Sequence, residues 1–198
     1  MGFEDKDGNV TPDQGSLFLI TSETLDNPIP VITPVNISNG MTWNYANNKF
    51  YYIDTPTDQV VQYDYDNKSG KITNPTTVFD VVKHQDRITG HPDGMTIDKD
   101  DNLWIALYGG GAVVKVDPRA GPEGKILQVI AIPAQYVTSV CWGGQNLKTL
   151  FVTTSRQRLD ELQRKEQPFA GALFAVKNLG TRGRRPIFSR IVGEILRP

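Results

Sequence analysis

The sequence has one cysteine, no long apolar run and no excess of charge of one sign, and each shortage excludes a class of protein. The single cysteine, Cys141, excludes a disulfide within the chain, and we expect it to be buried in a strand. No stretch approaches the roughly 18 apolar residues that a membrane-spanning helix needs. Acidic residues follow Met1 closely, where a signal peptide would carry an apolar segment. The sequence therefore predicts a cytoplasmic protein without a membrane span.

The charges are nearly balanced over the whole chain. The 198 residues include 21 Lys and Arg against 22 Asp and Glu, which gives a formal net charge of -1. This balance provides no general attraction to nucleic acid or to an anionic membrane surface, so we expect neither as a partner. A local basic cluster at residues 182–185 is expected to be an exposed hairpin.

A unit of three short, strand-like segments occurs three times along the chain. The segments are rich in Val, Ile, Tyr, Phe, Trp and Thr, and Gly, Asn and Asp separate them, which is typical of strands joined by tight turns. The copies start 54 and then 45 residues apart, a period typical of propeller blades. The segments are 39–43, 50–54 and 60–64, then 93–97, 103–107 and 112–116, then 138–142, 150–154 and 172–176.

These repeats predict an all-β propeller of about three and a half blades within one domain, residues 1–198. A fourth, outer strand is expected after each copy, at residues 77–80, 126–131 and 186–190. Residues 15–20 match 171–176, so the chain begins at the third strand of a blade. Closed propellers typically have four to eight blades, so we expect the chain to be part of a longer propeller.

One segment, residues 156–167, lacks strand character. Its leucines lie three residues apart among charged residues, which predicts a short surface helix or a mobile loop. Such an insertion is either a solvated excursion or a lid over the mouth of the channel.

The first strand of each blade lies nearest the central channel, so the residues that begin these strands meet at one mouth. They are Asn39, Asp93 and Thr138. An amide oxygen and a carboxylate in adjacent blades could share one hard divalent cation. Asn-Gly and Asp-Gly are also ordinary turn dipeptides, so turn formation remains an alternative explanation for the first two positions.

Other sites for chemistry are poorly supported. The three acidic stretches that begin at Asp5, Asp64 and Asp98 all lack the central glycine of a helix-loop-helix calcium loop. We expect them to be polar turns or coil. No serine lies in a Gly-x-Ser-x-Gly nucleophile elbow, which disfavours a serine hydrolase.

Six short motifs, in order along the chain, resemble the SMP-30/regucalcin/gluconolactonase family, which includes luciferin-regenerating enzymes. The resemblance extends from Met1 to about Phe188 and implies a six-bladed propeller that binds one divalent cation and hydrolyses sugar lactones. Some members of this family are calcium-binding regulatory proteins. The motifs are SNGMTW at 38–43, FYYID at 50–54, FD at 79–80, PDGM at 92–95, LWIA at 103–106 and GG at 143–144.

The resemblance implies roles for three residues. Asn39 and Asp93 match ligands of the cation, Asp93 also matches the proposed general base, and Glu4 resembles a carboxylate that contacts substrate. The family's first-blade glutamate ligand, and an Arg and an Asn that contact the sugar, have no counterpart here.

The resemblance therefore predicts a sugar lactone hydrolase that depends on Ca2+ or Zn2+, or else on Mg2+ or Mn2+, and that is impaired or inactive in this chain. The alternative that it leaves open is a calcium-binding regulatory protein without hydrolase activity.

Overall fold

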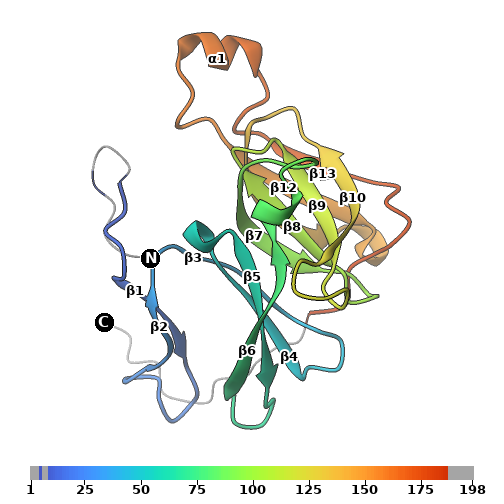
Figure 1. Cartoon of the computed structure of the whole chain (residues 1–198). Helices are drawn as coiled ribbons and strands as arrows, with labels where there is room; N and C mark the ends of the chain where they lie inside the picture. The colour runs from blue at the N-terminus through green and yellow to red at the C-terminus, as the bar shows by residue number, and fades with distance from the viewer. Residues whose placement is uncertain (1–4, 6–8, 187–198) are drawn as a thin grey trace.

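The computed structural model describes residues 5 and 9–186 and contains thirteen strands in these residues, arranged as sheets that lie side by side (Figure 1). A two-stranded sheet pairs β1 (Gly15–Leu19) with β2 (Ile29–Val35). The next sheet contains, in order, β3 (Ser38–Trp43), β4 (Lys49–Asp54), β5 (Gln59–Tyr65) and β6 (Ile72–Asp80). Every pairing in both sheets is antiparallel.

The remaining strands form the last two repeats. The second repeat contains β7 (His91–Ile97), β8 (Leu103–Tyr108), β9 (Ala112–Asp117) and β10 (Lys125–Ala131). The third contains β11 (Tyr136–Gly143), β12 (Thr149–Ser155) and β13 (Leu173–Val176). A single residue pair, Tyr108 with Tyr136, joins these two repeats into one seven-stranded sheet.

The structure confirms the all-β class and the order of strands within each predicted blade. Each predicted inner, middle and outer segment of the first two repeats coincides with a strand. The outer strand expected at residues 186–190 is not observed at Pro186, and residues 187–190 lie outside the described part of the chain. Sequence analysis assigned no strand to β2, which contains two prolines and pairs only with β1 among the described strands.

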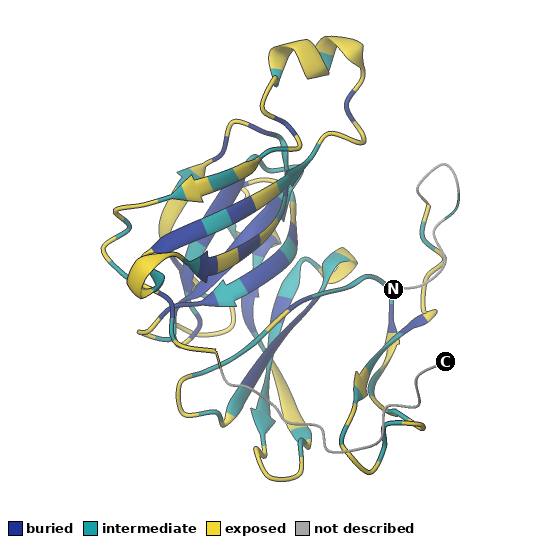
Figure 2. Ribbon diagram, turned by 180° about the vertical axis from the view of Figure 1, so that it is seen from behind, coloured by how far each residue is buried: buried dark blue, intermediate teal, exposed yellow. Residues whose placement is uncertain are grey.

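The apolar core lies between the sheets. Alternate residues of β8 point to opposite faces, because successive side chains of a strand alternate. Ile105 and Leu107 belong to a cluster with Tyr51 and Ile53 of the preceding sheet, and all four are buried. The sheets are therefore stabilised by their neighbours, and Figure 2 shows buried residues concentrated on the strands of the larger sheet.

The other face of β8 packs against the third repeat. Trp104 and Ala106 are 0% exposed and belong to a cluster with Val140 of β11 and Leu150 of β12. The Trp104 and Trp142 rings meet edge to face, with centroids 5.2 Å apart. The expectation that Cys141 is buried is wrong: it alternates with the buried Val140 and Trp142 and lies on the exposed face of β11.

The helix predicted within 156–167 is α1 (Glu161–Glu166). Asp160 caps it, because its carboxylate accepts a hydrogen bond from Gln163 N at 2.8 Å while the Gln163 side chain accepts from Asp160 N at 3.0 Å. Tyr136 pairs with Ser155, so α1 follows β12 at the end of the sheet where β11 begins. None of the described helices is both long and apolar enough to cross a membrane.

After β13 the chain turns back across the opposite end of all three repeats. Arg182 O accepts a hydrogen bond from Lys99 N, and Gly183 N donates to Leu147 O, both at 2.9 Å. The Arg184 guanidinium donates to Asn44 O. Residues 181–184 therefore join the turns that follow the three inner strands β3, β7 and β11.

Candidate functional site

The three inner strands share an irregularity at the positions that the sequence singled out. The pairing of β3 with β4 shifts register between Ser38 and Met41, and that of β7 with β8 shifts between Pro92 and Met95. The pairing of β11 with β12 shifts between Val137 and Ser139. Such irregularities bend a strand and redirect a side chain. Asn39, Asp93 and Thr138 each lie within one of these shifts.

Two glycines allow the inner strands to approach closely at this end. A Cβ atom at Gly40 would lie 2.7 Å from Asp93 O, and one at Gly94 would lie 2.2 Å from Ser139 Oγ. Both distances are shorter than a side chain tolerates, so only glycine fits without movement of the neighbouring strand. The Asn-Gly and Asp-Gly pairs therefore serve close packing between blades, and both lie inside strands.

This close approach brings Asn39 of β3 to Asp93 of β7. Burial raises the pKa of the Asp93 carboxyl to about 6, while hydrogen bonding from the Asn39 side chain and from Gly94 N opposes the rise. A carboxyl with this pKa is mostly ionised at neutral pH and still a better proton acceptor than an ordinary aspartate. The Thr138 hydroxyl bonds instead to the Thr153 hydroxyl at 2.8 Å.

A hydroxyl that the sequence analysis missed connects the two strands. Asn39 Nδ2 donates to Thr55 Oγ1 at 3.0 Å, and Thr55 Oγ1 donates to Pro92 O at 2.9 Å. Thr55 begins a short 3-10 helix, η1 (Thr55–Thr57), directly after β4. A signal was present in the sequence, since Thr55 directly follows the FYYID motif, but only the fold brings it to the next blade.

The start of β3 is held by Asp54. Its carboxylate accepts hydrogen bonds from Asn36 N at 3.1 Å and from Ile37 N at 2.8 Å. Thr55 N in turn donates to Ile37 O at 3.1 Å. The backbone that leads into Asn39 is therefore tied to the end of β4, which limits the movement of the Asn39 side chain.

The chemistry of this pair fits a hard divalent cation. The Asn39 Oδ1 atom accepts no hydrogen bond from the described residues, and amide and carboxylate oxygens are ligands that such cations prefer. Calcium requires about six to eight oxygens, so this pair supplies only a minority of them. No group of three His, Cys, Asp or Glu side chains that could hold a metal ion lies among residues 5 and 9–186. Glu4 lies outside the described residues.

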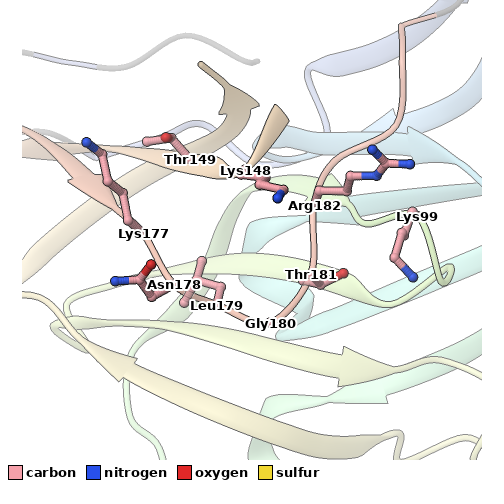
Figure 3. A pocket seen from close by; sticks show the side chains of 9 residues that line it. All are labelled: Lys99, Lys148, Thr149, Lys177, Asn178, Leu179, Gly180, Thr181 and Arg182. Atoms are coloured by element: carbon pink, nitrogen blue, oxygen red, sulfur yellow. The ribbon is translucent and has the colours of Figure 1, made fainter. Parts of the chain in front are cut away.

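Two cavities lie at the opposite end of the sheets from Asn39 and Asp93. One of about 580 Å³ lies beneath the segment after β13 (Figure 3), and another of about 940 Å³ adjoins it. Lys99, Lys148, Lys177 and Arg182 line the first, but these side chains are exposed, and Lys99 already pairs with Asp100 at 2.6 Å. These cavities form where residues 178–185 cross over the turns, and neither Asn39 nor Asp93 lines them.

Comparison with known proteins gives consistent matches over this region. The model of the SMP-30/Gluconolactonase/LRE-like region matches residues 1–156. YvrE of Bacillus subtilis, provisionally named a sugar lactone lactonase, is 45% identical over 153 residues, which are 77% of this chain and 50% of YvrE. Regucalcin of Sus scrofa is 36% identical over 173 residues, 87% of this chain and 55% of that protein.

The solved structure of a luciferin-regenerating enzyme has the same fold. It superimposes with a TM-score of 0.78 at 34% identity and covers 89% of this chain and 55% of that enzyme. The chain thus spans about half the length of the curated relatives that it matches.

Proposed function

Because the chain belongs to the SMP-30/gluconolactonase/LRE-like family, we propose that it is the part of a sugar lactone hydrolase that supplies two cation ligands and the general base. Asn39 and Asp93 are the proposed ligands, and Asp93 is also the proposed base. Glu4 is the proposed contact to the sugar. The observation that carries this proposal is the meeting of an amide and a partly buried carboxylate at the boundary between two blades.

The proposed reaction is hydrolysis of the cyclic ester. Water attacks the lactone carbonyl carbon, its proton moves to the Asp93 carboxylate, and the bond between that carbon and the ring oxygen breaks. The proton then passes to the departing ring oxygen, which leaves an open-chain hydroxy acid and restores Asp93. A bound divalent cation would polarise the carbonyl and lower the pKa of the attacking water. Burial raises the pKa of Asp93 in the cation-free chain, and a bound cation would oppose that rise, so the lowered pKa of the water would contribute as well.

Cation binding by the purified chain tests this proposal. We expect calorimetric titration with Ca2+, Zn2+, Mg2+ or Mn2+ to give one weak site, because two protein oxygens leave most positions to water. Asn39→Ala and Asp93→Asn should each weaken this binding at least tenfold. Asp86→Asn makes the same chemical change at an exposed position and should leave it unchanged. Equal affinity in the Asp93→Asn variant and the unmodified chain would refute the proposed ligand set.

Hydrolysis of gluconolactone by the same samples tests the catalytic part. We expect little or no turnover from the 198-residue chain, because the proposed site has too few ligands to hold the cation firmly. Turnover comparable to that of a full-length relative would contradict this expectation. Cation binding that promotes association with a protein partner, without hydrolysis in a chain extended by further blades, would favour the calcium-binding regulator instead.

We also propose that residues 1–198 form one partial propeller domain and that the protein is cytoplasmic. The apolar clusters shared between neighbouring sheets support the first proposal. The presence of a single cysteine supports the second, because it suits a reducing compartment.

A further inference from the structure

The Thr55 hydroxyl connects the two strands that carry the proposed cation ligands. It accepts a hydrogen bond from Asn39 Nδ2 and donates one to the carbonyl of Pro92, the residue before Asp93. We propose that Thr55 is a positioning residue, which fixes the Asn39 amide with its oxygen free to bind a cation and holds that amide at a set distance from Asp93. This inference rests on the proposed function, because it assigns Thr55 a role in the same site.

The direction of each hydrogen bond follows from elementary chemistry. A carbonyl oxygen can only accept, so the single proton of the Thr55 hydroxyl is committed to Pro92 O at 2.9 Å. The lone pairs of Oγ1 can then only accept a hydrogen bond from Asn39. The amide NH2 group can donate such a bond, whereas the amide oxygen has no proton to donate. The Thr55 hydroxyl therefore distinguishes the two ends of the Asn39 side chain.

This distinction matters because an amide has nearly the same shape in both orientations. A flipped Asn39 would turn its NH2 group toward the cation, which repels a positive charge and offers no lone pair. Without the hydroxyl, this orientation would depend on the hydrogen bond from the Asn39 side chain to the Asp93 carboxylate, and a cation bound to that carboxylate would compete with that bond. Loss of the hydroxyl should therefore lower the fraction of chains with the oxygen correctly oriented, and the apparent affinity falls by that fraction.

Thr55 also connects elements from two blades. It follows β4 in the sheet of β3–β6, the first complete blade. Its backbone N–H donates a hydrogen bond to Ile37 O near the start of β3. Its side chain reaches the backbone of β7 in the next blade. A single residue thus links the strand that carries Asn39 to the strand that carries Asp93.

Three variants test the role of this hydroxyl. Thr55→Val keeps the shape but removes the hydrogen bonds, Thr55→Ser keeps the hydroxyl, and Thr57→Val is a matched control. The Thr57 hydroxyl bonds within its own turn, to Asp54 O at 2.7 Å, and touches neither proposed ligand through its hydrogen bonds. Calcium affinity of the folded chain, measured by calorimetry, should fall about 10- to 100-fold in Thr55→Val, the range seen when groups supporting a metal ligand are removed. Thr55→Ser should remain within about threefold of the original affinity, in line with a hydroxyl-dependent role.

A spectroscopic measurement separates positioning from simple loss of folding. The side-chain amide of Asn39 gives its own pair of proton–nitrogen NMR signals, which Asn39→Ala assigns. We expect Thr55→Val to shift these signals and to speed their exchange with water, while the backbone spectrum away from the site stays unchanged. Thr57→Val should leave the Asn39 signals in place.

The outcomes separate this inference from the proposed function. Weaker calcium binding in Asn39→Ala and Asp93→Asn, but unchanged affinity and unchanged Asn39 signals in Thr55→Val, would overturn the role of Thr55 alone. If the calcium affinity is unchanged in Asn39→Ala, Asp93→Asn, Thr55→Val and Thr55→Ser, the proposed ligand set is wrong, and this inference is wrong with it. The role of Thr55 would be supported if the calcium affinity falls in Thr55→Val but not in Thr55→Ser and the Asn39 signals shift in Thr55→Val.

Discussion

Within the seven-stranded sheet, the second repeat (β7–β10) packs against apolar neighbours on both faces, and we call it the enclosed sheet. The third repeat (β11–β13) packs against such a neighbour on only one face. In β8, the side chains of residues 103–107 alternate between the β3–β6 sheet and the third repeat, and all five are buried. In β13, Leu173 is 64% exposed, and Cys141 of β11 is exposed as well. A propeller blade therefore gains its stability from two neighbours, and a repeat with one neighbour leaves apolar side chains in water. The candidate site lies where two inner strands meet, β3 and β7.

The largest effect that this comparison predicts is at the buried charge of the enclosed sheet. Asp98 is 0% exposed and accepts hydrogen bonds from Asn102 N at 3.0 Å and Trp104 Nε1 at 3.1 Å, while Lys115 Nζ lies 3.2 Å away. Asp98→Asn would leave the Lys115 ammonium without its counter-charge. We expect a loss of about 3–5 kcal/mol in the free energy of unfolding, measured by urea denaturation at pH 7.

The pH dependence of this loss provides a second measurement. Burial alone would raise the pKa of Asp98, but its hydrogen bonds and Lys115 outweigh burial and lower it. The stabilisation is therefore present above the usual aspartate pKa and is lost as the pH falls through the lowered value. The difference between the original chain and Asp98→Asn should narrow below about pH 4. A similar loss in the exposed control Asp86→Asn would contradict this explanation.

A leucine of the enclosed sheet should give the next largest effect. Leu107 is 0% exposed and belongs to the cluster between the first complete blade and the enclosed sheet. Leu107→Ala removes buried methyl groups and leaves a cavity, so we expect a loss of about 2–5 kcal/mol. Urea denaturation with an unchanged slope would attribute the loss to the folded state. A loss below about 1 kcal/mol would show that this boundary collapses to fill the space.

Close packing between inner strands predicts a smaller effect at Gly94. A Cβ there would meet the Ser139 side chain and lie 2.7 Å from Ser139 Cα, so β7 and β11 must move apart. We expect Gly94→Ala to cost about 1–3 kcal/mol, the range for overpacking. The double variant Gly94→Ala with Ser139→Gly removes the side-chain part of the clash and should recover some of the loss. Full recovery would show that the backbone contact is unimportant.

The strands could be predicted from the sequence because repeated units carry the same local signals. Apolar β-branched segments at equivalent positions, such as 103–107 and 150–154, became the middle strands β8 and β12. The acidic turn after β7 is indeed a hairpin turn, because it joins the antiparallel strands β7 and β8 and Asp98 N donates to Asn102 O at 3.0 Å. The strand β2 was missed, since Pro30 and Pro34 argue against a central strand and only an edge position accommodates them.

The candidate site could be predicted only in part. The repeats place Asn39 and Asp93 at equivalent positions, but equivalence does not give the distance between two blades. That distance depends on Gly40 and Gly94, whose missing side chains allow the inner strands to touch. Thr55 escaped prediction because its partners lie 16 and 37 residues away and in two different blades. Contacts of this kind arise from packing between sheets, which local patterns do not encode.

The smallest effect is expected at the open face, where a second leucine provides a matched control for Leu107. Leu173 lies on β13 with 64% of its surface exposed, so most of its apolar area stays in water in the folded chain. Leu173→Ala should therefore change the free energy of unfolding by less than about 0.5 kcal/mol, measured under the same conditions as Leu107→Ala. The same substitution at both positions isolates the contribution of a neighbouring sheet. If a further blade covers this face in a longer form of the protein, Leu173→Ala should cost about 2–5 kcal/mol there, and a loss that stays below about 0.5 kcal/mol would show that the face remains open.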